Sequence, residues 1–252
     1  MQITVIKPNR LFVTAAIAIA VTIGVFIWKT YTDLLPLPGS LTLDASNVRK
    51  VQVLDRHNIP LTVTYQNRWN IHDYVALHTI PLFLQQAFVV SEDKRFYEHR
   101  GVDWKARCYA FWQNLKALRP VRGASTISEQ VIRMWRPRPR TIWSRWLEGC
   151  EATRLERAFS KADILEFYLN QVPYSGQRRG VVQAARYYFD RDLDTLNQIE
   201  MLALVVLVRA PGRMDLHRGT TEIKGPIRRL AERLLKRGLI DRGQYALSLI
   251  HI

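Results

Sequence analysis

Two adjacent carboxylates at the end of an apolar run, Glu92 and Asp93, are candidates for acid–base chemistry. A carboxylate acts as a general base near neutral pH when burial or a neighbouring negative charge raises its pKa. His99 and Asp103 follow on a predicted tight turn around Gly101. The same pattern is also typical of an ordinary polar helix end closed by a glycine, so other groups must decide between the two interpretations.

A run of arginines further along the chain could bind phosphate; it comprises Arg133, Arg136, Arg138, Arg140 and Arg145. Guanidinium groups bind phosphate oxygens bidentately and keep their charge at any relevant pH. Pro137 and Pro139 alternate with these arginines and favour an extended segment. The alternative is an ordinary basic surface loop.

Helical spacing predicts that several of these polar residues share a face. Ser125, Glu129 and Arg133 are four residues apart, and Glu129 precedes Arg133 in the favourable orientation for an ion pair. Arg140 and Glu148 are eight residues apart, which predicts a second common face. Carboxylates beside arginines would suit transfer of a group from a diphosphate.

Composition narrows the class of protein. The 252 residues are 48% hydrophobic and 23% charged, which is typical of a globular chain. Lysine and arginine total 37 against 22 acidic residues, which gives a net charge of +15. This excess indicates an anionic partner, which is nucleic acid, a phosphate-bearing substrate or anionic lipid. With only Cys108 and Cys150 there is no disulfide framework or zinc spacing, and a disulfide between these two stays open.

Residues 11–28 form an uncharged apolar stretch that can span a bilayer core of about 30 Å. No small-residue cleavage site follows it, which favours an uncleaved anchor over a signal peptide. Lys7 and Arg10 precede the stretch and predict a cytoplasmic N-terminus with an exported body. Export in turn argues against nucleic acid as the partner of the positive charge.

Beyond this stretch the pattern is mostly helical. Val48–Tyr65 reads as a β-hairpin around the turn-forming residues 55–58. Apolar periodicity and start signals then predict helices at residues 81–93, 102–118, 125–134, 141–159, from Ser160 onward, at 181–189, 198–210 and after Lys224.

The motifs of this chain resemble those of a known family, the peptidoglycan glycosyltransferase domain of family 51. This domain is found in monofunctional transglycosylases and class A penicillin-binding proteins. Residues 92–103 match the family motif E-D-x-x-F-x-x-H-x-G-x-D at every fixed position, and residues 123–130 are similar to G-G-S-T-I-T-Q-Q. Residues 164–170, 184–189 and 200–211 follow the downstream pattern, so the similarity covers roughly residues 75–215.

The resemblance implies a mainly α, lysozyme-like glycosyltransferase domain with a membrane-embedded jaw, here with a short N-terminal β-hairpin and one transmembrane helix. The expected organisation is a cytoplasmic tail at 1–10, an anchor at 11–28, a linker and hairpin at 29–70, the glycosyltransferase domain at 71–220, and a basic helical segment at 221–252 whose end is expected to be truncated. The expected location is the bacterial inner membrane, with the catalytic domain on the extracytoplasmic side.

The implied reaction is polymerisation of lipid II into glycan strands with release of undecaprenyl diphosphate and inversion. By resemblance, Glu92 is the base and Glu148 assists at the donor or diphosphate. The expected substrate-binding residues are Asp93, Phe96, His99, Ser125, Thr126, Glu129, Gln130, Arg133, Arg140 and Arg145. The expected partners are lipid II, the growing strand, the membrane and proteins of cell-wall elongation or division, with no nucleic acid. No cofactor is required, no metal site is specified, and Mg²⁺ or Mn²⁺ at the diphosphate is left open.

The chain departs from the family pattern at Ala124, Ser128, Glu129, Ser144–Arg145 and Leu147. Glu129 adds a negative charge near the expected diphosphate pocket unless Arg133 neutralises it. These departures keep two alternatives open, a non-catalytic membrane-anchored protein that binds lipid II or cell wall, and a lysozyme-like enzyme that cleaves glycan. Ser91 and Lys94 satisfy the S-x-x-K pattern of penicillin-binding serine enzymes, but no S-D-N or K-T-G partner motif follows.

Overall fold

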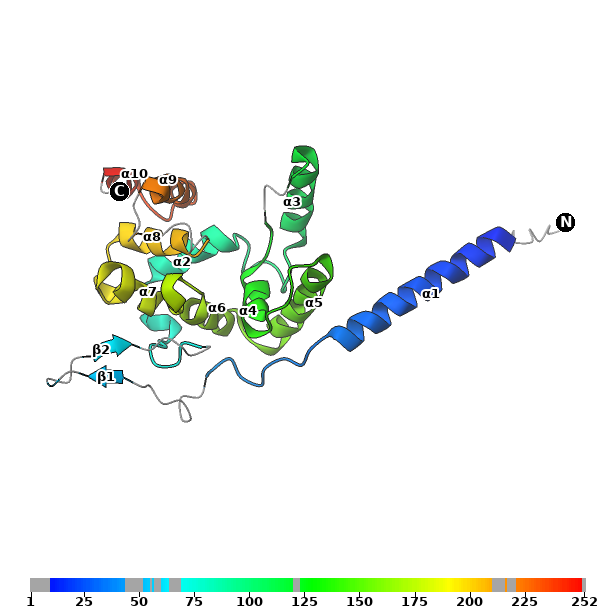
Figure 1. Cartoon of the computed structure of the whole chain (residues 1–252). Helices are drawn as coiled ribbons and strands as arrows, with labels where there is room; N and C mark the ends of the chain where they lie inside the picture. The colour runs from blue at the N-terminus through cyan, green and yellow to red at the C-terminus, as the bar shows by residue number, and fades with distance from the viewer. Residues whose placement is uncertain are drawn as a thin grey trace.

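The computed structural model describes residues 10–43, 52–54, 56, 60–63, 69–119, 123–209, 216 and 221–250, and there the chain is mainly helical, as predicted (Figure 1). The α-helices are α1 (Arg10–Asp33), α2 (Leu82–Glu92), α3 (Trp104–Ala117), α4 (Ile127–Trp135), α5 (Ile142–Ala158), α6 (Lys161–Gln171), α7 (Gly180–Phe189), α8 (Gln198–Leu207), α9 (Thr221–Leu235) and α10 (Arg242–Ile250). Three short 3₁₀ turns occur at Leu77–Thr79, Ser175–Gln177 and Leu193–Thr195.

Two short strands, β1 (Gln52–Leu54) and β2 (Pro60–Val63), pair antiparallel, with an irregular register at the end of β1. Of the predicted turn at residues 55–58 only Arg56 is among the described residues. The hairpin as a whole therefore stays a prediction, as do the proposed domain boundaries.

The core forms where α2, α6, α7 and α8 meet, with α9 lying across α8 and α2 (Figure 1). Every residue of Met201–Leu207 on α8 is buried, as expected for a helix that is apolar all round. Leu84, Ala87 and Phe88 of α2 are also inaccessible to solvent. Two helices of the core therefore position Glu92, which is the last residue of α2, and Arg209, which follows α8 by two positions.

Capping boxes set where three of the described helices begin. Thr126, Ser160 and Asn197 each accept a hydrogen bond from the backbone N–H three residues on, and an acidic side chain there returns the bond in a capping box. The start predicted at Ser160 is confirmed. The start predicted at Ser125 is two residues early, because the Thr126 hydroxyl caps α4 and holds Ser125 outside it.

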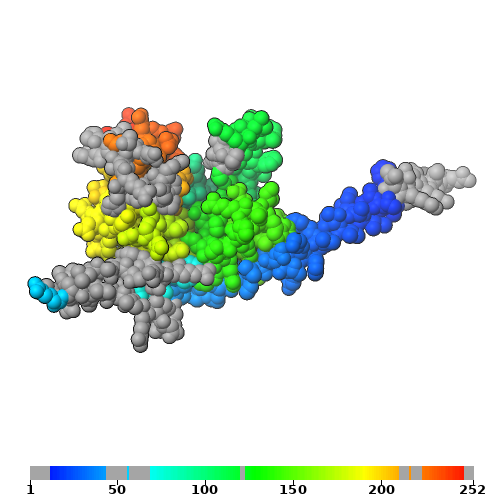
Figure 2. Space-filling model, in the orientation of Figure 1, coloured from blue at the N-terminus to red at the C-terminus, as the bar shows by residue number. Residues whose placement is uncertain are grey.

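α3 stands away from the core and leaves most of its apolar side chains in solvent. Among its residues only Ala110 is buried. The large exposed side chains on and beside α3 are Trp104, Tyr109, Phe111, Trp112, Leu115 and Leu118. A hollow separates α3 from α9 and α10 in the space-filling view (Figure 2).

α1 is long and apolar enough to cross a membrane, and no residue of its 18-residue apolar window is buried against the rest of the chain. This helix contains the whole stretch predicted at residues 11–28 and continues to Asp33. Its C-terminal end lies against α5, where the indole N–H groups of Trp143 and Trp146 donate to Asp33 (2.8 Å) and Thr30 (3.1 Å). The Phe26 ring contacts both indoles, with centroids 5.6 and 5.4 Å away.

Candidate active site

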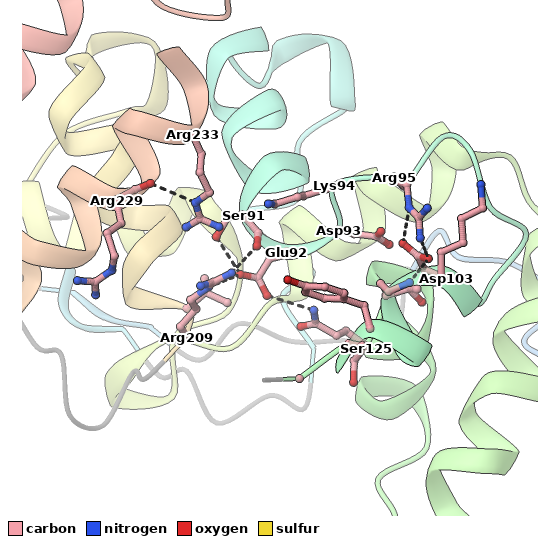
Figure 3. A pocket seen from close by; sticks show the side chains of 18 of the residues that line it. Ser91, Glu92, Asp93, Lys94, Arg95, Asp103, Ser125, Arg209, Arg229 and Arg233 are labelled. Carbon is pink, nitrogen blue, oxygen red and sulfur yellow. Dashed lines mark hydrogen bonds and ion pairs between the residues drawn. The ribbon is translucent and has the colours of Figure 1, made fainter. Parts of the chain in front are cut away.

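A polar cleft of about 1210 Å³ opens beside the end of α2. Its walls come from the end of α2 and the segment after it, the first turns of α3, the start and one face of α4, the residues that follow α8, and α9 with the turn after it. Figure 3 shows Glu92 near the centre of this cleft, with Arg209, Arg229 and Arg233 to one side and Asp93, Arg95 and Asp103 to the other. The two distant parts of the chain that line it, 91–133 and 208–237, meet only in the folded protein.

The Glu92 carboxylate receives three hydrogen bonds from side chains of the described residues. Oε1 accepts from the Ser91 hydroxyl (3.1 Å) and from Nε of Arg209 (2.9 Å). Oε2 accepts from the Gln130 amide (3.2 Å), whose oxygen accepts from the Tyr168 hydroxyl (3.4 Å). The Glu92 side chain is 11% exposed, so this carboxylate is held in place yet remains open to the cleft.

Asp93 points the other way and braces the start of α4. Its Oδ2 accepts from the backbone N–H of Ile127 (3.0 Å), the first residue of that helix. Both its oxygens lie within hydrogen-bond distance of Nε2 of His99 (3.0 and 2.9 Å). The Nδ1 atom of His99 is buried with no hydrogen-bond partner among the described residues, 3.8 Å from a carboxylate oxygen of Glu156. Asp93 borders the cleft, but its hydrogen bonds fix the position of α4.

Glu148 is buried and bound by Arg133. The guanidinium donates from Nη2 to Oε2 (2.7 Å) and from Nε to both carboxylate oxygens (3.1 and 3.2 Å). Nη2 also lies 3.4 Å from the Ser125 hydroxyl. Arg133 lines the cleft, so α4 joins the two glutamates, presenting Gln130 to Glu92 and Arg133 to Glu148.

Glu129 forms a different ion pair from the predicted one. Its carboxylate pairs with Arg107 of α3, and it also accepts from the backbone N–H of Thr126 (2.9 Å) as part of the cap. Burial raises the pKa of Glu129, although the Arg107 guanidinium opposes this effect. The predicted Glu129–Arg133 pair is wrong, because the buried Glu148 competes for Arg133 from a separate helix.

A second ion pair holds the first turn of α3. Asp103 caps α3 by accepting from the Ala106 N–H (2.8 Å), and it pairs with Arg95. Burial alone would raise the pKa of Asp103, but the bonds from Arg95 and from the Ala106 amide outweigh burial and lower the pKa below its ordinary value.

The sequence of the chain matches a known protein family. Residues 59–235 match the model of the Transglycosylase family. The chain belongs to this family. A monofunctional glycosyltransferase of Staphylococcus haemolyticus is 30% identical over 75% of this chain and 72% of its own length. A biosynthetic peptidoglycan transglycosylase of Nitrosomonas eutropha is 28% identical over 83% and 80% respectively. Among solved structures, penicillin-binding protein 1A from Haemophilus influenzae matches with a TM-score of 0.44 at 19% identity, covering 71% of this chain and 17% of that one.

In this transglycosylase, the fold brings some of the predicted site residues together and leaves others apart. Glu92, Asp93, Ser125, Thr126, Gln130 and Arg133 line the cleft. Phe96 is fully buried and lies behind it, with Nζ of Lys161 4.3 Å from its ring centroid. His99 and Glu129 reach the site only through their partners Asp93 and Thr126.

Arg140 and Arg145 do not reach the cleft. Arg140 lies in the loop before α5, where Thr141 is the cap, so the predicted helical face shared with Glu148 is wrong. Both residues are exposed and outside the cleft lining. A prediction based on helical spacing fails here because the helix begins two residues after Arg140.

The cleft contains cations that sequence reasoning missed. Neither Arg209 nor any arginine of the predicted basic segment at 221–252 was among the predicted site residues. Arg229 and Arg233 are four residues apart on one face of α9, Arg237 follows two residues after its end, and all three line the cleft. That spacing was visible in the sequence, but nothing local showed that this face turns toward Glu92.

Within the part of the chain that the structure describes, no three side chains of His, Cys, Asp or Glu are grouped so that they could hold a metal ion. Cys108 is exposed on α3 and Cys150 is half-buried on α5, and both are free thiols.

Proposed function

We propose that the chain polymerises lipid II into glycan strands, using Glu92 as the base. As a transglycosylase family member it is a peptidoglycan glycosyltransferase. The observation that carries the proposal is the placement of the Glu92 carboxylate, tethered at one oxygen by Arg209, in a cleft otherwise rich in arginine and lysine. A fixed base in a cationic cleft suits attack on a sugar whose leaving group is a diphosphate.

In the proposed step the 4-hydroxyl of the incoming sugar gives its proton to Glu92. The electron pair of the broken O–H bond forms the new bond to the anomeric carbon of the growing strand. The bond from that carbon to the diphosphate oxygen breaks, and the electron pair leaves with undecaprenyl diphosphate. Attack opposite the leaving group inverts the configuration at the anomeric carbon.

The departing diphosphate needs positive charge close to the breaking bond. Arg133 lies on the cleft wall 2.7 Å from the buried carboxylate of Glu148, which orients its guanidinium from behind. We propose that Arg133 binds the diphosphate and that Glu148 acts through it. Arg140 lies outside the cleft, and a direct role for it requires the loop before α5 to approach the bound lipid. The reaction needs no cofactor in this scheme, and Mg²⁺ or Mn²⁺ at the diphosphate stays a prediction.

The substrate is anchored in a bilayer, so the cleft must open close to lipid. The apolar surface of α3, whose first turn lines the cleft, and the apolar helix α1 support a membrane-embedded arrangement. We propose that both elements contact the inner membrane, that the body is lysozyme-like, and that it lies on the extracytoplasmic side. Partners of cell-wall elongation or division remain predictions.

One assay separates this function from its rivals. Full-length protein in detergent is given labelled lipid II in one reaction and preformed glycan strands in another. New polymer from lipid II supports the transferase. Shortening of the glycan would instead support a lysozyme-like hydrolase, and retention of lipid II without turnover would support a binding protein; either result contradicts the proposal.

A further inference from the structure

We infer that Arg209 is a positioning residue for the base: with Ser91 it occupies Oε1 of Glu92 and thereby makes Oε2 the oxygen that takes the proton. The inference rests on the proposed function, in which Glu92 is the base. It goes further by dividing the work between the two carboxylate oxygens and by giving a role to an arginine outside the motif that carries Glu92.

The hydrogen bonds around Glu92 are unequal at the two oxygens. A carboxylate oxygen has two lone pairs and accepts two hydrogen bonds well. Oε1 already accepts two, from Nε of Arg209 at 2.9 Å and from the Ser91 hydroxyl at 3.1 Å. Oε2 accepts one, from Gln130 at 3.2 Å. Among the described residues, the remaining lone pair of the carboxylate is therefore on Oε2.

Arg209 is held by more than its contact with Glu92. Its Nη2 donates to the backbone carbonyl of Ser91, so the guanidinium binds the end of α2 at two points. The backbone N–H of Arg209 donates to the carbonyl of Val206 (3.1 Å), which continues the turn of the buried helix α8. Because α8 packs against α2, the arginine and the carboxylate are both positioned by the core.

A planar guanidinium with two donors on two acceptors fixes orientation better than a single charge does. It holds the plane of the Glu92 carboxylate in one orientation. The arrangement also separates Arg209 from the arginines that could bind phosphate, because Nε and Nη2 are both engaged by the α2 end.

Other groups that face Glu92 must be considered in any pH experiment. They are Tyr168 through Gln130, the neighbouring Asp93 and Lys94, and Arg133, Arg229, Arg233, Arg237 and Glu232 on the cleft walls. Burial raises the pKa of Tyr168 well above its ordinary value, so this phenol stays neutral throughout. The cleft arginines keep their charge at all relevant pH values. Arg209 itself donates from Nε to the Glu92 carboxylate (2.9 Å).

The test compares Arg209→Gln with wild type in lipid II polymerisation across pH. Loss of the fixed carboxylate plane is expected to lower kcat by about 10- to 100-fold. Loss of the adjacent positive charge is expected to move the acid limb of kcat/KM upward by about one pH unit. KM stays within about twofold, because substrate binding is left to other arginines. A raised KM with unchanged kcat and pH profile would overturn the inference and make Arg209 a phosphate ligand.

Arg209→Lys decides the matter if Arg209→Gln fails to fold. Lysine keeps the charge but cannot make the two-point contact with Glu92 and the Ser91 carbonyl. We expect the acid limb to stay within about 0.3 pH units of wild type while kcat falls about tenfold. A wild-type kcat in this variant would overturn the inference.

Arg191→Gln is the matched control. Arg191 forms an ion pair with Glu200 in the first turn of α8 (3.4 Å), and this pair lies outside the cleft. Its pH profile is expected to match wild type, and a shift equal to that of Arg209→Gln would count against the inference. If wild type makes no polymer, the proposed function itself fails. If wild type polymerises, Glu92→Gln does not, and the Arg209 variants behave as wild type, only the role of Arg209 fails.

Discussion

At the scale of single residues, the site depends on the hydrogen-bond partners of two carboxylates, Glu92 at the cleft and the buried Glu148. Glu92 keeps one oxygen lone pair open to the cleft, whereas Glu148 is covered by Arg133 through three hydrogen bonds. The same residue type thus has two environments, one suited to accept a proton and one suited to hold a cation. This difference supports the assignment of base to Glu92 and of a supporting role to Glu148.

Replacing Arg133 and Arg140 separates binding from folding. Arg133→Ala leaves the buried Glu148 carboxylate without its ion-pair partner. It is expected to lower the free energy of unfolding by about 3 kcal/mol and also to lower polymerisation activity. Arg140→Ala removes an exposed side chain and is expected to leave Tm unchanged while weakening use of lipid II, if the loop approaches the diphosphate. Tm and KM are measured for each, with the exposed Arg157→Ala of α5 as control. Equal losses of Tm for both variants would contradict this division.

Asp103→Asn tests the ion pair at the start of α3 through its pH dependence. The pKa of Asp103 is lowered in the folded protein, so its ionised form stabilises the fold above the ordinary aspartate pKa of about 3.9. That stabilisation is lost as the pH falls through the lowered value. The Tm difference between wild type and variant is therefore expected to be largest near neutral pH and to shrink below about pH 4. A constant difference across this range would show that charge is not involved.

At the scale of elements, α4 is the part that organises the cleft. Its first residue is fixed by Asp93 and its cap by Gly101, whose carbonyl accepts from the Thr126 hydroxyl (2.6 Å). Its successive turns then present Gln130 and Arg133. A shift of this helix would disturb both glutamates together.

Thr126→Ala should reveal this dependence. Loss of an N-cap costs about 1 kcal/mol, and here it also frees the helix from Gly101, so activity is expected to fall with stability. Ser160→Ala removes the corresponding cap of α6, which is exposed and remote from the cleft. We expect it to lower Tm by a similar amount while retaining polymerisation. Equal polymerisation activity in both variants would show that the position of α4 does not govern activity.

Features set by local sequence were predictable, whereas contacts between separate helices were not. The helices, the cap at Ser160 and the placement of Glu92 were predictable because periodicity, capping and the first motif are local signals. The contacts Arg209–Glu92 and Arg107–Glu129 were not, because they join residues 117 and 22 positions apart through the packing of separate helices. Arg140 was misplaced for the opposite reason, since a helical period was extended across a helix start.

At the scale of the whole molecule, two apolar surfaces lie at different places on the chain. The α3 surface adjoins the cleft, whereas α1 is joined to α5 by indole bonds from Trp143 and Trp146. α5 also carries Glu148, two residues after Trp146, so the proposed anchor is in contact with the helix that supports Arg133. This connection would set the distance of the cleft from the bilayer.

Cys108 reports whether α3 enters lipid, because its thiol is exposed on that helix. A fluorescent label on Cys108, in a Cys150→Ala background, is expected to be quenched by brominated lipids when the protein is reconstituted in vesicles. The control carries the label at Arg191→Cys on the exposed surface before α8, with both native cysteines replaced. Equal quenching at the two positions, or none at Cys108, would contradict membrane contact by α3.

The most direct test of the central claim is lipid II polymerisation by Glu92→Gln beside wild type, both shown to be folded by their Tm. Glutamine keeps the size of the side chain but cannot take up the hydroxyl proton at neutral pH. We predict polymer and released undecaprenyl diphosphate from wild type and a loss of at least about 10²-fold in the variant. Polymerisation by Glu92→Gln at the wild-type rate would contradict the account.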